Sequence, residues 1–189
     1  MVSVAAAAIR GFLLIFGAIV LGLSVSLAKQ QVLGSPPAET TFFAFAGAFG
    51  IIVSLLGILA IFIDKIPSVG IMAADSLASV FYIAGAIALT VALKPVSSCT
   101  SSDDVPREER YLNKLLNGGC AKPDPKGPPI CPNAGSDLTG KHIDSYTAGR
   151  CQKVQADYVF GYVAFAFSAA AIVLNLLARG RRGTSGTYV

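Results

Sequence analysis

Four cysteines are the side chains of this sequence with the clearest capacity for chemistry. Cys99, Cys120, Cys131 and Cys151 all lie in one hydrophilic stretch, residues 94–157. Four thiolates can hold zinc, and His142 could join them, but zinc ligands usually come in C-x₂₋₄-C pairs and no two of these cysteines are closer than eleven positions. An even number of cysteines in one segment favours disulfides instead. No acid-base partner for a catalytic thiol is recognisable beside any of them.

Arg10 and Asp75 are the second candidate pair, because both interrupt otherwise apolar surroundings. Ionisable residues are rare in hydrocarbon and usually face one another or a polar interior. Arg10 is long enough to extend toward lipid headgroups, whereas Asp75 must face the interior, against Arg10, a hydroxyl such as Ser54 or Ser76, or water. The pair is interpreted either as a clasp between helices or as part of an ion or proton relay. No nucleophile-base set, metal cluster or phosphate loop is present, so we expect neither an enzyme nor a cofactor.

Four long apolar runs must position these residues: 5–28, 42–63, 69–93 and 158–178. Each is close to the ~20 residues that a helix needs to cross a bilayer. Charged residues make up 14% of the chain, against roughly 25% in soluble proteins. The first run is too long for a signal peptide. The sequence therefore predicts an all-α membrane protein, with a four-transmembrane-helix bundle over residues 1–178 and a basic tail over 179–189.

The orientation follows from the basic residues at the helix ends. Arg179, Arg181 and Arg182 follow the fourth run and indicate a cytoplasmic C-terminus. Four crossings then place the N-terminus in the cytoplasm and residues 94–157 outside, where disulfides persist. The three arginines are also expected to attract anionic inner-leaflet lipids, at about 1 kcal/mol each.

The external loop is expected to contain two disulfides and one short helix. Of the three possible pairings, the nested one is favoured. In it, Cys99 and Cys151 join the ends of the third and fourth helices, while Cys120 and Cys131 close the Pro- and Gly-rich stretch 121–130. A helix is predicted over 106–117, ended by two glycines. Its apolar side, expected to pack on the loop, comprises Tyr111, Leu112, Leu115 and Leu116.

Small residues recur every four positions on three of the helices. They form faces on which helix backbones can approach closely, either within the bundle or between neighbouring proteins in the membrane. These residues are Ala46, Gly50 and Ser54 on the second helix, Ala84, Ala88 and Ala92 on the third, and Ala164 and Ser168 on the fourth.

These features together resemble the MARVEL-domain proteins. The resemblance rests on the four-span plan, Arg10 early in the first helix, Asp75 early in the third, Cys99 after it, and the sequence Arg-Cys-Gln-Lys-Val-Gln-Ala-Asp at 150–157 before an aromatic helix start. The chain looks most like the fungal non-classical export proteins associated with eisosomes. It departs from their shorter loop in Cys120, Cys131 and the Pro-rich insertion. The family's loop cysteines correspond to Cys99 and Cys151, which adds weight to that disulfide.

The resemblance implies a non-enzymatic plasma-membrane organiser that associates with sterol- and sphingolipid-rich domains and with other membrane proteins. A homo-oligomer is compatible with it, and no nucleic-acid partner is expected. The alternative is a small channel or transporter, or an accessory subunit of one, that uses the Asp75/Arg10 pair. Tetraspanins would carry a Cys-Cys-Gly motif and claudins a tryptophan motif, and both motifs are missing. Plant Casparian-strip-like proteins share the Arg and the Asp.

Overall fold

The computed structural model describes residues 2–63, 68–121, 130–131 and 141–183. Its helices are α1 (Val2–Lys29), α2 (Ala38–Phe62), α3 (Ser68–Leu93), α4 (Asp104–Leu112) and α5 (Lys141–Gly183). Four of them, α1, α2, α3 and α5, are long and apolar enough to cross a membrane. The all-α fold with four spanning helices, predicted from the apolar runs, is thereby confirmed.

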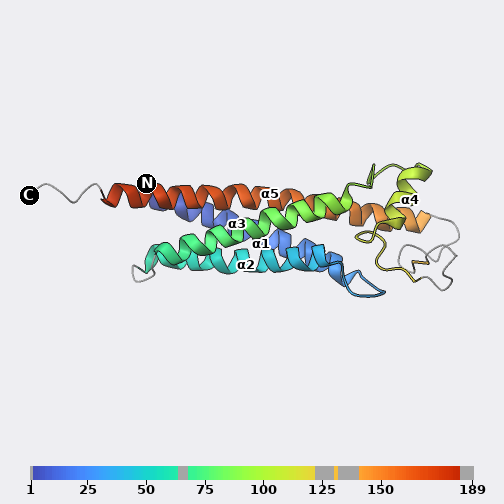
Figure 1. Ribbon diagram of the computed structural model, residues 1–189, viewed down its shortest axis with the longest axis horizontal. Coiled ribbons are helices and arrows are strands. Elements are labelled where there is room, and N and C mark those ends of the chain that lie inside the picture. Colours follow the sequence, from blue (N-terminus) through green and yellow to red (C-terminus); the bar gives the residue numbers. More distant parts are fainter. Residues whose placement is uncertain (1, 64–67, 122–129, 132–140, 184–189) are drawn as a thin grey trace, which may run out of the picture.

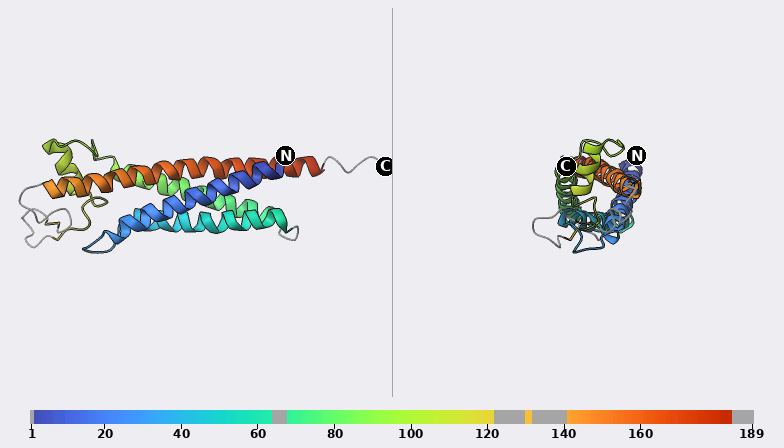
Figure 2. Two further views of the ribbon diagram at one scale, coloured as in Figure 1. Left: turned by 180° about the vertical axis from the view of Figure 1, so that it is seen from behind. Right: turned by 90° about the vertical axis from the view of Figure 1, so that its right-hand side faces the viewer.

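The four long helices form a ring in which each packs against two neighbours. α1 lies beside α2 and α5, and α3 lies beside the same two helices. α1 begins and α5 ends at one end of the bundle, whereas α4 and the connection from α1 to α2 lie at the opposite end (Figures 1 and 2). The described part of the cysteine-rich segment is therefore on the opposite side of the span from the start of α1 and the end of α5.

Buried positions follow a seven-residue repeat along the helices. On α1 the buried residues follow one another at alternating intervals of three and four positions. They are Arg10, Leu13, Gly17, Val20, Ser24 and Leu27. The same spacing on α5 runs through Val154, Asp157, Gly161, Ala164, Ser168 and Ala171. A repeat of 3.5 residues is typical of helices that cross at a shallow angle and interlock their side chains.

One large side chain fills the space that two glycines leave open in the middle of the bundle. Phe43 of α2 is fully buried against Gly85 of α3 and Gly161 of α5, and a Cβ at either glycine would collide with the ring. At Gly47 the backbones of α2 and α1 themselves meet, since a Cβ there would come within 2.7 Å of a backbone nitrogen of α1. These glycines therefore set how closely the helices approach.

Two helix boundaries differ from the sequence prediction. The fourth long helix begins at Lys141 and not at Tyr158, because the polar turns before Tyr158 are ordered by contacts that hydropathy does not register. The short helix spans Asp104–Leu112 and ends before the predicted Asn117, because Asn113 takes an extended conformation. There, its side-chain oxygen accepts a hydrogen bond from the Leu115 amide, and its nitrogen donates to the Ala92 carbonyl at 2.8 Å.

Candidate functional site

Arg10 and Asp75 form a bidentate ion pair inside the bundle. One terminal nitrogen of Arg10 donates to Asp75 Oδ1 and the other to Oδ2, the second bond measuring 2.6 Å. The two residues are 4% and 1% exposed. On its way from α1 to α3 the arginine passes Gly57 of α2, where a Cβ would collide with the guanidinium. Paired in this way, two charges in a low-dielectric interior neutralise each other.

A second polar pair lies toward the other end of the span. Ser24 of α1 donates a 2.6 Å hydrogen bond to Asp157 Oδ2, and both residues are fully buried. Ser24 is fourteen positions after Arg10, so the two pairs are about 21 Å apart along α1. The other carboxylate oxygen of Asp157 has no hydrogen-bond partner among the described residues. The sequence analysis missed this pair, although the seven-residue spacing of Arg10, Gly17 and Ser24 could have revealed it.

Between the two pairs, the described polar groups do not form a continuous hydrogen-bonded chain. Ser54 donates to the Gly50 carbonyl of its own helix at 2.7 Å. Thr90 bonds to the Ala86 carbonyl at 2.8 Å and contacts the Tyr162 hydroxyl. Tyr82 is 1% exposed, and its hydroxyl, beside Gly50, has no partner among the described residues. The described hydroxyls thus mostly satisfy their own helices.

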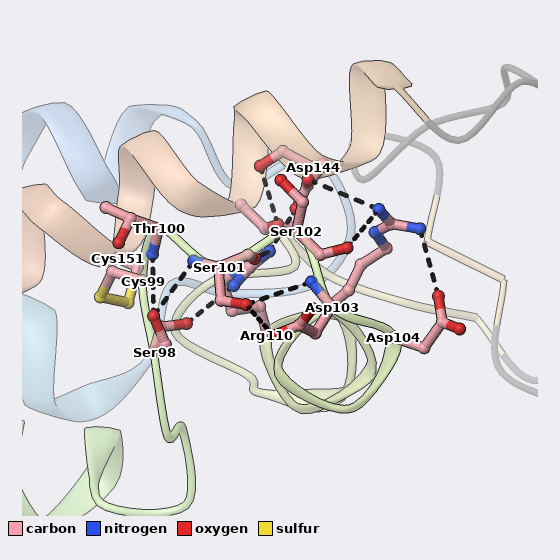
Figure 3. Close-up of polar contacts among 12 residues, drawn as sticks. Ser98, Cys99, Thr100, Ser101, Ser102, Asp103, Asp104, Arg110, Asp144 and Cys151 are labelled. Carbon is pink, nitrogen blue, oxygen red and sulfur yellow. Dashed lines mark hydrogen bonds and ion pairs between the residues drawn. A yellow bond between two sulfur atoms is a disulfide. The ribbon is translucent and has the colours of Figure 1, made fainter.

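Beyond the bundle, residues 94–121, 130–131 and 141–157 make up what we call the cap. Its disulfides join Cys99 to Cys151 and Cys120 to Cys131, which is the nested pairing. The first links the end of α3 to α5 (Figure 3). The second joins the neighbours of Ala121 and Ile130, two residues that exchange two 2.9 Å backbone hydrogen bonds. Residues 122–129 lie outside the described part of the chain.

Arg110 of α4 holds the cap together from within. It is fully buried and donates to the carbonyls of Ser98 at 2.7 Å and Ser101 at 2.9 Å, and it is also ion-paired with Asp144 at the start of α5 (Figure 3). One side chain therefore ties the loop after α3 and helix α4 to α5. The sequence analysis did not single out Arg110, because an arginine in a polar segment gives no sign that its side chain faces inward.

Arg150 attaches the cap to α5 from the other side. Its Nε and Nη2 donate to the Leu115 carbonyl at 3.1 and 2.8 Å, and the arginine itself is 2% exposed. Leu115 and Leu116 are buried in the continuous apolar core. The apolar side of the predicted short helix therefore does pack on the chain's own fold at these two positions, whereas Leu112 is 56% exposed.

A small cleft opens between α1 and α5 at the end where both chain termini lie. Its volume, including the open mouth, is about 210 Å³. The lining residues are Ala6, Ile9, Arg10, Ala171, Leu174 and Asn175. Asn175 was missed in the sequence, where a lone amide among leucines and isoleucines does not alter the hydropathy of the run.

The predicted packing residues have different positions in the structure. The buried ones are Ala46, Gly50 and Ser54 on α2 and Ala164 and Ser168 on α5. On α3, by contrast, Ala84 is exposed and Ala88 and Ala92 are half-buried, because Tyr82, Ala86 and Leu89 face the core. Of the two alternatives for the small residues, packing inside the bundle therefore does not apply to Ala84.

The side chains of His142, Arg179, Arg181 and Arg182 lie outside the described part of the chain. Within that part, no group of three His, Cys, Asp or Glu side chains could hold a metal ion.

Comparison with known proteins decides between the four-span families. The family model for MARVEL, the membrane-associating domain, matches residues 3–174, which include the cap, three whole spans and the fourth span up to residue 174. The chain belongs to the MARVEL family. No curated protein and no solved structure shows a comparable match. In this MARVEL domain the ion pair, the Ser24–Asp157 pair and both disulfides all lie within the matched residues.

Proposed function

We propose that this MARVEL protein is a non-enzymatic organiser of the plasma membrane. It associates laterally with lipids and with other membrane proteins, and so builds or stabilises microdomains. The main support is the contrast between the interior and the surface of the bundle. Inside, charged groups neutralise each other, as Arg10 and Asp75 do. Outside, the helices present large apolar side chains to the bilayer, including Phe12, Ile52, Leu59, Ile87 and Val173.

The proposal includes an orientation. The basic tail after α5 favours a cytoplasmic position for both termini, and the cap then faces an oxidising compartment in which its disulfides persist. Thiol labelling of intact cells tests this orientation. We expect no labelling of the cap cysteines unless a reductant is added to the outside. Labelling without a reductant, or only after the cells are permeabilised, contradicts it.

The lateral contacts are assigned to the outward small-residue face of α3. Ala84 is exposed and Ala88 is half-buried, so helices of neighbouring proteins can approach there closely. The sequence resemblance to the fungal eisosome-associated branch, with its sterol- and sphingolipid-rich domains, leads us to expect such contacts within membrane patches. A homo-oligomer would use the same face.

Substitution by leucine tests this assignment with a matched control. Ala84→Leu adds bulk to the proposed face, whereas Ala18→Leu adds the same bulk at an exposed position of α1. We expect Ala84→Leu to reduce clustering of the fluorescently tagged protein in cell membranes at unchanged thermal stability, and Ala18→Leu to leave clustering intact. Equal clustering of both variants and wild type contradicts the assignment. Ion flux through proteoliposomes that is lost in Asp75→Asn contradicts the organiser role itself.

A further inference from the structure

Asn175 carries a polar group that the bundle does not use. It lies on α5, three residues before the fourth apolar run ends, and it is half-buried. Its amide makes no side-chain hydrogen bond to any described residue, although it lines the cleft between α1 and α5. An amide in hydrocarbon without a partner is unfavourable, and polar side chains in membranes normally find one. Since the described residues provide no partner, a group from the membrane can take this place.

The cleft beside this amide is open to the membrane and closed toward the bundle. Ala6, Ile9 and Leu174 are half-buried at its mouth, while Arg10 and Ala171 are 4% and 5% exposed at its inner wall. Because Arg10 is neutralised by Asp75, the cleft does not require a charged atom inside it. The cleft is shallow, because its volume of about 210 Å³ includes the open space at its mouth. A lipid can therefore lie against it only with a small part, such as an ester group and its first methylenes.

The helix register places basic residues beyond the cleft. Arg179 and Arg182 are four and seven positions after Asn175 on α5, and such positions share one face of a helix. Position 179 lies about 6 Å further along the axis. The polar layer of a bilayer is roughly 5–8 Å thick in each leaflet. With the Asn175 amide at the level of the lipid esters, position 179 is at the level of the phosphates.

We propose that this cleft binds one anionic glycerophospholipid from the leaflet at the end of the bundle where α1 begins. The Asn175 amide donates to an ester carbonyl, the first methylenes lie against the shallow cleft beside Ala6 and Leu174, and the phosphate lies toward positions 179 and 182. A second copy of the chain fits less well, because two copies meeting at this face would bring their arginines together. The inference rests on the proposed lipid association and assigns one site to it.

Native mass spectrometry of the purified full-length protein tests this site. The probes are phosphatidylglycerol and phosphatidylcholine, added separately in detergent. Asn175→Leu removes the amide at nearly constant shape, and Val173→Leu is the control, since Val173 is 53% exposed on the same helix. We expect Asn175→Leu to bind phosphatidylglycerol about fivefold more weakly, as for the loss of one net hydrogen bond. The control is expected to bind as wild type does.

The double variant Arg179→Gln/Arg182→Gln should remove the preference for phosphatidylglycerol over phosphatidylcholine. Unchanged phosphatidylglycerol binding in Asn175→Leu overturns the proposal, provided that circular dichroism shows an intact fold. A shift of Asn175→Leu from dimer to monomer overturns it in favour of a second copy. Because binding is measured on isolated molecules, this result is independent of clustering in cells, and either proposal can fail without the other.

Discussion

Removal of one partner from the Arg10–Asp75 pair should destabilise the bundle far more than removal of both. Asp75→Asn leaves a guanidinium that is 4% exposed and cannot lose its proton, opposite a neutral amide. Breaking a buried pair in this way costs about 3–5 kcal/mol. Arg10→Met should also destabilise the bundle, because it leaves the Asp75 carboxylate buried without its partner.

The double variant Arg10→Met/Asp75→Leu replaces the pair by apolar side chains of similar total volume. Such replacements are often neutral, so we expect a free energy of unfolding within about 1 kcal/mol of the wild-type value. The wild type, Arg10→Met, Asp75→Leu and the double variant form a double-mutant cycle with a coupling energy of at least about 2 kcal/mol. Unfolding by SDS, followed by circular dichroism in mixed micelles, measures each value.

A solvent-accessible ion pair of the same chain provides the control. Lys114 and Glu39 are in contact at 2.6 Å, but the lysine side chain is 67% exposed, so Lys114→Gln should change stability by less than about 1 kcal/mol. Additive effects of the two substitutions at Arg10 and Asp75 would refute the reasoning. They would mean that the charges do not depend on each other and that each is solvated separately.

Three further predictions concern the disulfide, the core and the cap. Cys99→Ala/Cys151→Ala opens a loop with a sequence separation of 52, so unfolding in micelles should become easier by about 4 kcal/mol; an unchanged midpoint contradicts this. Gly50→Ala drives a methyl group into Tyr82 and should lower stability by about 1–3 kcal/mol, whereas equal stability would mean that the helices move apart freely. Hydrogen bonds from the side chain and backbone of Ser97 lower the pKa of Glu109 below 4.5. The contact therefore stabilises the cap above that pH and is lost as pH falls through the lower value. The protection of the Ser97 amide against exchange, relative to the intrinsic rate at the same pH, should fall there in wild type and should be low at all pH values in Glu109→Gln.

The sequence predicts the spans because their signal is local and strong. Twenty consecutive apolar residues have few alternatives to a membrane helix, and all four runs are helical. The beginning of α5 at Lys141 was missed because it depends on tertiary contacts, chiefly the bonds of Arg150 to the Leu115 carbonyl and of Arg110 to Asp144. The sequence pattern of the polar segment does not indicate such tertiary contacts.

It was harder to predict which face of each helix is buried than to predict the helix itself. Small residues on α3 recur every four positions as they do on α2, yet Ala84 is exposed while Gly50 is buried. In lipid an alanine gains little by burial, since the surrounding chains are as apolar as the core. Large and polar side chains decide instead. On α3, Tyr82 and Asp75 determine which face of the helix is buried, and the alanines take the positions that remain.

The same reasoning explains why polar pairs lie near both ends of the spans. Apolar side chains are about as stable against lipid as against another helix, so they do not fix how far one helix is shifted along its neighbour. A buried polar group at one position of a seven-residue repeat does, because a shift would leave it unpaired. Arg10 and Ser24 occupy equivalent positions of α1 and bond to α3 and α5, respectively. Sliding α1 by one turn would break both pairs, so together they fix its register relative to two neighbours.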